Sequence, residues 1–182
     1  MSGRPAWLPG DPPPQKFMER VIRVDHAGEY GATRIYQGQL TVLGHGKKAD
    51  VLRHMRDQEQ RHLETFSDLV VRRRVRPTAL LPLWHVAGFA LGAMTAALGE
   101  RAAMACTVAV EEVIDAHYAG QIAALDEQES ELRQTLSDFR AEELQHRDIG
   151  LAHGAEQAPG YRLLSAAIKA GCRAAIAMSE RV

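Results

Sequence analysis

The sequence predicts an all-α protein built around a four-helix bundle. Glycine and proline concentrate in the first fourteen residues and at a few turns, which leaves long uninterrupted runs. Within these runs apolar residues recur at helical spacing, and no alternating strand pattern stands out. A chain of 182 residues has the usual size of one domain with one core. We therefore expect a single helical domain over residues 16–182.

Residues 1–15 contain five of the eight prolines of the chain, and this composition favours a disordered Pro-rich leader. The leader lacks the basic start and apolar middle of a secretory signal. Beyond it, glycines and prolines separate six expected helices. Their ranges are 15–43, 48–73, 79–98, 101–126, 128–153 and 160–180.

The first two helices each carry an acidic residue within the stripe expected to face the core. In the first, the stripe is Ile22, His26, Glu29, Thr33, Tyr36 and Leu40. This stripe is partly polar, so Glu29 is identified mainly by its spacing of 30 residues to Glu59. In the second, the stripe is Leu52, Met55, Glu59, His62, Phe66 and Leu69. Glu59 and His62 are therefore expected at core positions.

The third helix lies in a run without charged side chains, from Pro77 to Gly99. The run is about long enough to span a bilayer, but a proline, a histidine and its glycines lower its hydrophobicity. The arginines within residues 72–76 would favour anionic lipid head groups. We expect an interfacial helix lying on or partly in a membrane, with a buried crossover and a true span as alternatives. Gly88 and Gly92 would permit close helix contact.

In the fourth helix two adjacent glutamates compete for one core position. Glu111 shares a stripe with Met104, Val108, Tyr118, Ile122 and Leu125, whereas Glu112 falls on a face of alanines. The register favours Glu111. The fifth helix resembles the second, with the stripe Leu132, Leu136, Phe139, Glu143, His146 and Gly150. The last is expected to be a C-terminal amphipathic helix.

Glu-x-x-His thus occurs twice on core-facing stripes, and residues three apart share one helix face, so each pair can hold a metal. In the ferritin-like arrangement two helices give Glu-x-x-His and two others give one glutamate each. Four glutamates in one core would be costly without cations to neutralise them. We therefore predict two metals bound by Glu29, Glu59, His62, Glu111, Glu143 and His146.

Composition excludes several other functions. A net charge of -1 argues against nucleic-acid binding as the main task. Cys106 and Cys172 lie in apolar helical patterns, which favours free thiols in a reducing compartment. No glycine-rich dinucleotide fingerprint is present, so reducing equivalents are expected from an external electron donor.

Four segments resemble the demethoxyubiquinone hydroxylase family of ubiquinone biosynthesis. They are D-H-A-G-E-Y-G-A at 25–32, R-V-R-P-T at 74–78, A-C-T-V-A-V-E-E at 105–112 and E-E-L-Q-H-R-D-I-G-L at 142–151. The resemblance implies a ferritin-like di-iron fold with two Fe2+ ions, held by the six residues named above. It also implies that the chain hydroxylates a demethoxyubiquinol-type ring with O2.

The same resemblance implies peripheral attachment to a membrane surface, a polyprenylated quinone substrate and a lipid-binding partner protein. The membrane would be a bacterial inner membrane at its cytoplasmic face, or the mitochondrial inner membrane at its matrix face. A substrate dissolved in lipid needs a pocket that opens toward the membrane, and the uncharged crossover is placed to provide it.

Further residues near the predicted ligands are candidates for supporting roles. His117 and Tyr118, a turn or two beyond Glu111, are predicted to handle substrate or protons as catalytic residues, with core packing as the alternative for Tyr118. Asp25 and Asp115 each lie four residues from a predicted ligand glutamate and could accept hydrogen bonds from the ligand histidines, or lie on the surface. The other five histidines are expected in packing or surface roles.

Three other functions would use the same ligand pattern. They are a ferritin-like ferroxidase or iron-storage protein, a manganese catalase, and a non-catalytic membrane-associated scaffold stabilised by its metals. The uncharged crossover argues against a soluble storage cage.

Overall fold

The computed structural model describes residues 14–45 and 49–182, so the predicted leader lies outside the described residues except for its last two, which begin the first helix. The described ranges contain six α-helices, two short 3-10 helices and no strand. The α-helices are α1 (Pro14–Leu43), α2 (Ala49–Arg72), α3 (Leu81–Ala97), α4 (Glu100–Ala124), α5 (Ser130–Ala152) and α6 (Tyr161–Ser179). The predicted all-α class and its six helices are confirmed.

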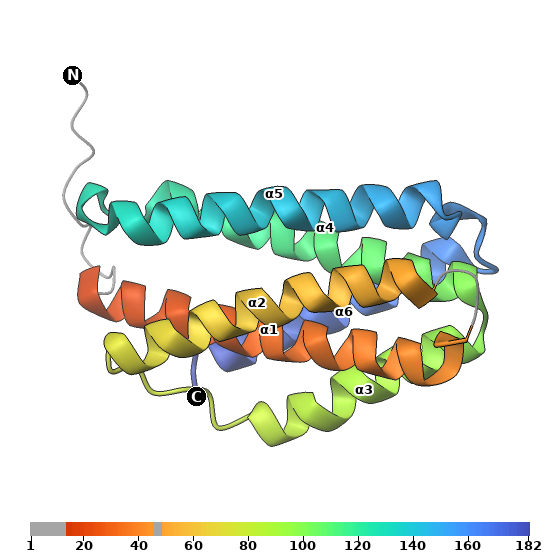
Figure 1. Cartoon of the computed structure of the whole chain (residues 1–182). Helices are drawn as coiled ribbons and strands as arrows, with labels where there is room; N and C mark the ends of the chain where they lie inside the picture. Colours follow the sequence, from red (N-terminus) through yellow and green to blue (C-terminus); the bar gives the residue numbers. More distant parts are fainter. Residues whose placement is uncertain (1–13, 46–48) are drawn as a thin grey trace.

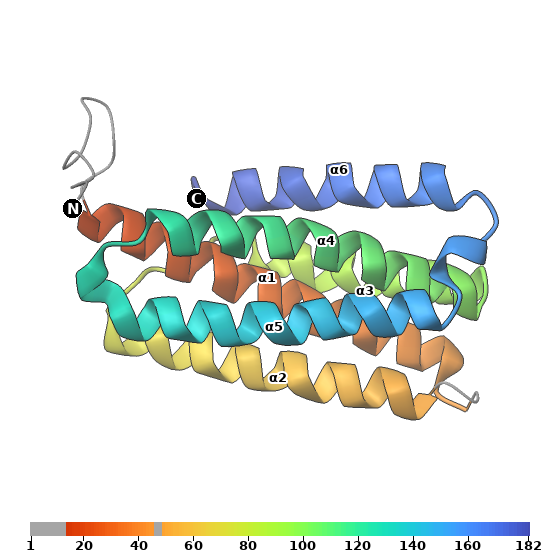
Figure 2. The same ribbon diagram turned by 90° about the horizontal axis from the view of Figure 1, so that it is seen from above.

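Two antiparallel hairpins, α1/α2 and α4/α5, form the four-helix bundle (Figure 1). Helix α3 is the crossover between them and packs along the outside of α1. Helix α6 returns along α4, on the side away from α2 (Figure 2). The bundle thus carries one extra helix on each hairpin, and α3 and α6 flank the same side of the α1/α4 pair.

The helical stripes predicted from the sequence form the core. In α2 every residue of the predicted stripe is buried. One apolar cluster, which includes Ile22, Phe66 and Leu136, fills one end of the bundle. A second, which includes Tyr36 and Met104, fills the other end. The buried glutamates and histidines lie between these clusters along each helix, so the polar layer is closed off from solvent at both ends.

Helices α1 and α3 approach each other more closely than any side chain would allow. A Cβ added at Gly92 would collide with the backbone carbonyl of Ile35, and one added at Gly38 would collide with that of Phe89. Glycine is needed here because backbone occupies the space that a side chain would fill. The close contact predicted from Gly88 and Gly92 is confirmed.

None of the helices in the described part of the chain has both the length and the apolar character needed to cross a bilayer. Helix α3 has 17 residues and begins at Leu81, two residues later than predicted, with Pro82 in its first turn, where the missing N–H costs no helical hydrogen bond.

Candidate metal centre

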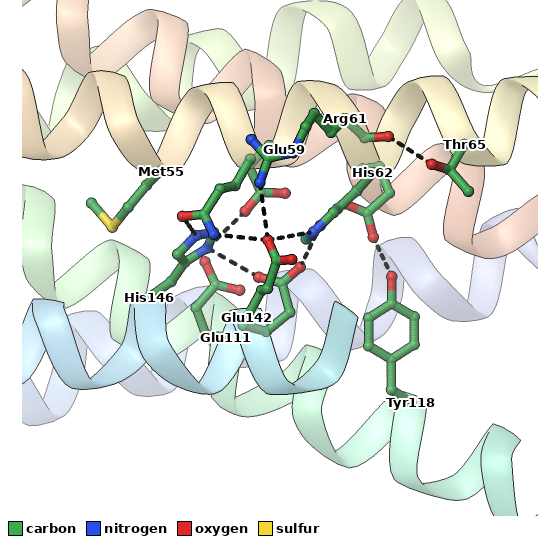
Figure 3. Close-up of polar contacts among 12 residues, drawn as sticks. Met55, Glu59, Arg61, His62, Thr65, Glu111, Tyr118, Glu142 and His146 are labelled. Carbon is green, nitrogen blue, oxygen red and sulfur yellow. Dashed lines mark hydrogen bonds and ion pairs between the residues drawn. The ribbon is translucent and has the colours of Figure 1, made fainter. Parts of the chain in front are cut away.

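The six side chains predicted as metal ligands meet in the middle of the bundle, and each residue is at most 4% exposed. His62 Nδ1 lies 3.0 Å from Glu143 Oε1. His146 Nδ1 lies 3.0 Å from Glu59 Oε1 and 3.2 Å from Glu143 Oε2. Figure 3 shows Glu59, His62, Glu111 and His146 pointing into this shared space from three helices.

The donor atoms form two overlapping groups. One is Glu29, Glu59, His62 and Glu143, the other is Glu59, Glu111, Glu143 and His146, and the ligand atoms within each group lie within 4.8 Å of one another. Glu59 and Glu143 belong to both groups. Because a carboxylate has two oxygens, a shared glutamate can bridge two neighbouring cations. The cluster could therefore hold two metal ions, each with one histidine.

Four buried donor atoms of this cluster make no well-aligned hydrogen bond in the described structure, although both Nδ1 atoms lie within 3.2 Å of carboxylate oxygens. They are Glu59 Oε1, His62 Nδ1, Glu143 Oε2 and His146 Nδ1. Buried polar atoms are normally paired, so four unpaired ones around one point call for a missing partner. Carboxylate oxygen and imidazole nitrogen together suit first-row divalent metals. The residues present therefore fit a two-metal centre.

The pKa values of the cluster residues also indicate that the buried carboxylates need positive charge beside them. Burial raises the pKa of Glu59 and Glu111 well above the usual value, and the negative charge of Glu143 raises it further. Burial alone would lower the pKa of both histidines, but close contacts with carboxylates outweigh it and raise the values to about 11 for His62 and about 9 for His146. Without metals, protons must supply the charge that the carboxylates require.

The structure distinguishes the two adjacent glutamates of α4, Glu111 and Glu112. Glu111 faces the cluster and accepts a hydrogen bond of 3.2 Å from Tyr36 Oη. Glu112 forms an ion pair with Lys169 of α6 on another side of α4. Sequence reasoning did not identify Tyr36 as a neighbour of the cluster, although it lies on the same α1 stripe as Glu29.

Of the two alternatives left open for the aspartates, neither residue is an acceptor for His62 or His146. Asp115 forms an ion pair with Arg140 of α5, with 2.6 Å between Oδ1 and Nε. Asp25 accepts a hydrogen bond of 2.8 Å from Gln121 and lies 3.4 Å from His117 Nε2. Both aspartates are therefore engaged elsewhere.

The acceptors for the two histidines predicted as ligands are residues that the sequence analysis did not identify. His62 Nε2 lies 3.3 Å from Glu142 Oε2, and His146 Nε2 lies 3.1 Å from Gln58 Oε1. Each acceptor directly precedes the glutamate of a Glu-x-x-His pair on the opposite helix. That position was visible in the sequence, but its meaning depends on how α2 and α5 pack.

The two predicted catalytic residues lie at different depths. Tyr118 is buried, and its hydroxyl donates a hydrogen bond to Glu29. Burial raises the pKa of this phenol well above its usual value. The His117 side chain is 17% exposed and contacts Asp25 and Gln121 rather than the cluster. Burial raises the pKa of Asp25 to about 6, against the opposing contacts with His117 and Gln121.

A cavity of about 540 Å³ extends along the cluster between α1, α3, α4 and α6. Four glutamates of the cluster, Glu29, Glu59, Glu111 and Glu143, contribute to its wall. Almost all of the remaining wall is apolar, and it includes exposed positions such as Gly171. Across it, Trp84 Nε1 of α3 donates a hydrogen bond of 3.0 Å to Ser179 Oγ of α6. The cavity joins the buried carboxylates to the surface between these two helices.

The chain is similar to known proteins over nearly its whole length. A protein from Rhodospirillum rubrum named 3-demethoxyubiquinol 3-hydroxylase is 61% identical over 176 residues, which cover 96% of this chain and 83% of that protein. A Homo sapiens protein named NADPH-dependent 3-demethoxyubiquinone 3-hydroxylase, mitochondrial, is 57% identical and covers 91% of this chain and 78% of its own length. A Saccharomyces cerevisiae protein named 5-demethoxyubiquinone hydroxylase, mitochondrial, is 44% identical, with coverage of 91% and 78%.

The family model described as ubiquinone biosynthesis protein COQ7 matches residues 16–179, from the first turn of α1 to the end of α6. All six predicted ligands, the apolar cavity and the crossover helix lie inside the matched range. The chain belongs to the COQ7 family of ubiquinone biosynthesis proteins.

Proposed function

We propose that this chain is a di-iron monooxygenase that uses O2 to hydroxylate a demethoxyubiquinol-type ring carrying a polyprenyl tail. The observation that carries the proposal is the apolar cavity whose wall includes four glutamates of the cluster. The names of the relatives support the substrate class. Glu29, Glu59, His62, Glu111, Glu143 and His146 would hold two iron ions, which when bound supply the activation of O2.

The side chains around the cavity have separate roles in binding the tail and in positioning the ring. The apolar walls of α3 and α6 bind the tail and keep water away from the ring, which strengthens every electrostatic interaction at the cluster. The glutamates at the wall place the ring beside the metal site. Electrons come from an external donor, because the sequence carries no glycine-rich dinucleotide fingerprint.

The cavity also decides against iron storage or a ferroxidase role. Hydrated iron ions need a polar route to the site, whereas the wall here is mostly apolar apart from the cluster itself. An organic substrate matches this lining. A manganese catalase or a scaffold would have no use for so large an apolar space beside the metals.

We also propose that α3 and α6 rest on a membrane surface, with the protein attached peripherally at the cytoplasmic face of a bacterial inner membrane or the matrix face of a mitochondrial one. Large exposed apolar side chains lie on these helices and the turn after α3: Leu83, Val86, Met94, Leu98, Leu163 and Met178. The same two helices flank the cavity, so a lipid-dissolved tail could enter between them. A lipid-binding partner protein stays a prediction from the family resemblance.

Filling the cavity should abolish hydroxylation without disturbing the fold. A Cβ added at Gly171 meets no atom within 4 Å, and this residue lines the cavity. Gly171→Leu should therefore occupy substrate space, while leucine in a helix adds about 1 kcal/mol of stability over glycine. The test is expression in cells that lack this hydroxylation step, with the demethoxy intermediate followed by mass spectrometry.

The matched control is Gly120→Leu, since a Cβ at Gly120 also meets no atom within 4 Å but the residue lies outside the cavity wall. Cells with the wild-type chain or Gly120→Leu should consume the intermediate. Cells with Gly171→Leu should accumulate it at least tenfold, with iron content unchanged. Persistence of the intermediate in cells with the folded, iron-loaded wild type would refute the proposed function.

We propose that Tyr118 handles a proton at Glu29 and that His117 with Asp25 carries it toward the surface. The support is the Tyr118 to Glu29 hydrogen bond and the partial exposure of His117. Tyr118→Phe removes only the hydroxyl, so it should lower kcat about 10- to 100-fold and leave metal content and KM near wild type. His117→Gln should lower kcat less, by about tenfold. Equal kcat values for wild type and Tyr118→Phe would show that the hydroxyl only packs.

A further inference from the structure

Glu142 lies where three side chains of α2 converge on one carboxylate oxygen. Its Oε2 lies 2.8 Å from Gln58 Nε2, 3.3 Å from His62 Nε2 and 3.4 Å from an Arg61 guanidinium nitrogen. Figure 3 shows Glu142 of α5 reaching toward His62 and Arg61. This side chain therefore joins the two helices that carry the Glu-x-x-His pairs.

The contact with Glu142 selects one tautomer of His62. A carboxylate accepts hydrogen bonds and does not donate them, so the imidazole nitrogen facing Glu142 must carry a proton. That nitrogen is Nε2, so in the neutral imidazole the Nδ1 lone pair is directed at the cluster. The ring is also held by stacking on Phe139, with 3.9 Å between ring centroids.

The same carboxylate selects the tautomer of His146 through Gln58. The Gln58 amide nitrogen donates to Glu142, so the amide oxygen must face His146. The reverse orientation would place the amide oxygen against the carboxylate oxygen of Glu142, which is repulsive. An amide oxygen only accepts, so His146 Nε2 carries the proton and Nδ1 faces the cluster.

We propose that Glu142 is the positioning residue for both ligand histidines, directly for His62 and through Gln58 for His146. This inference deepens the proposed function, since it concerns the metal site on which that function rests. The two branches differ: His62 donates to a charged acceptor, whereas His146 donates to a neutral amide. Loss of a group that orients a ligand histidine typically changes metal affinity about 10- to 100-fold. Because the two histidines have different acceptors, the two metals should bind with different affinities.

The experiment is equilibrium dialysis of the full chain against Co2+, which reports the stoichiometry and affinity of both sites without substrate or turnover. Wild type is compared with Glu142→Ala, Glu142→Gln and Gln58→Ala. The matched control is Arg61→Ala, which breaks the ion pair with Glu142 but leaves its contacts to His62 and Gln58. Circular dichroism confirms that each variant is folded.

Glu142→Ala should weaken both Co2+ sites by about 10- to 100-fold, because both histidines lose their orientation. Gln58→Ala should weaken one site only. Glu142→Gln is the variant that retains the fold if alanine does not, and its effect should be largest at the His62 site, where the charged acceptor is lost. Arg61→Ala should bind two Co2+ with wild-type affinities.

The inference is overturned if Glu142→Ala or Glu142→Gln keeps both wild-type affinities, or if Gln58→Ala weakens both sites equally. A merely structural role for Glu142 would lower the melting temperature and leave Co2+ affinity unchanged, which also overturns it. If this binding pattern holds but the wild type fails to hydroxylate the quinone, only the proposed function is lost.

Discussion

Replacing Glu111 by glutamine should abolish hydroxylation and yet stabilise the metal-free protein. Glu111 is 3% exposed, and burial together with Glu143 raises its pKa well above the usual value. Glutamine removes the charge but keeps an oxygen that can accept the hydrogen bond from Tyr36. Removing an uncompensated buried acid should stabilise the metal-free form by about 1–4 kcal/mol. Activity should fall at least 100-fold, because one metal loses a ligand.

The neighbouring residue provides the control. Glu112→Gln is the same chemical change one position along α4, but it alters an ion pair with Lys169 rather than the cluster. Its metal content and activity should match wild type, and its stability should change by less than about 1 kcal/mol. Thermal melts of metal-free and Co2+-loaded protein check both variants. If the metal-free Glu111→Gln protein is less stable than wild type, the buried Glu111 side chain does not destabilise the fold.

The cost of burying these acids explains why the candidate site could be predicted from the sequence. The side of a helix that faces a hydrophobic core normally carries apolar residues. In α2, Glu59 and His62 interrupt this apolar stripe, and both side chains are buried. A carboxylate at a core position is costly unless it binds something. Polar residues at core positions of one helix are therefore enough to indicate a binding site.

Contacts that depend on packing between helices could not be predicted from the sequence. Asp115 has the same spacing to a ligand as Asp25, but the rotation of α4 turns it toward Arg140. Gln58 and Glu142 act on histidines of the opposite helix, so no spacing within one helix identifies them. The cavity likewise depends on how α3 and α6 lie against α1 and α4. Periodicity predicts which side faces the core and does not predict which partner it meets.

The stability gained from bound metal should increase as pH rises from 6.5 to 9. In the metal-free protein the pKa of His146 is raised to about 9 and that of His62 to about 11, above the ordinary 6.5. A group with a raised pKa stabilises the fold fully below its unfolded value, and this contribution is lost as pH climbs toward the folded value. The raised pKa values of the acids Glu59 and Glu111 act in the same direction above pH 4.5.

Glu143 does not reverse this trend, although contacts with both histidines outweigh burial and lower its pKa to about 2. A lowered acid pKa contributes stability that is fully present above the ordinary value of 4.5, so it stays constant between pH 6.5 and 9. The metal-free protein should therefore lose stability across this window. Metal binding follows the opposite trend, because Nδ1 must be deprotonated to become a ligand.

Thermal melts of metal-free and Co2+-loaded protein at pH 6.5, 7.5 and 9 measure the difference directly, and the gap in melting temperature should widen by several degrees. Calorimetric titration of Co2+ in buffers of different ionisation enthalpy should also show proton release, with at least one proton from each ligand histidine at pH 7.5. The double variant His62→Gln with His146→Gln removes both titrating histidines and should make the stability of the metal-free protein less dependent on pH. A gap that is constant or narrows with pH would mean that protons do not occupy the place of the metals in this core.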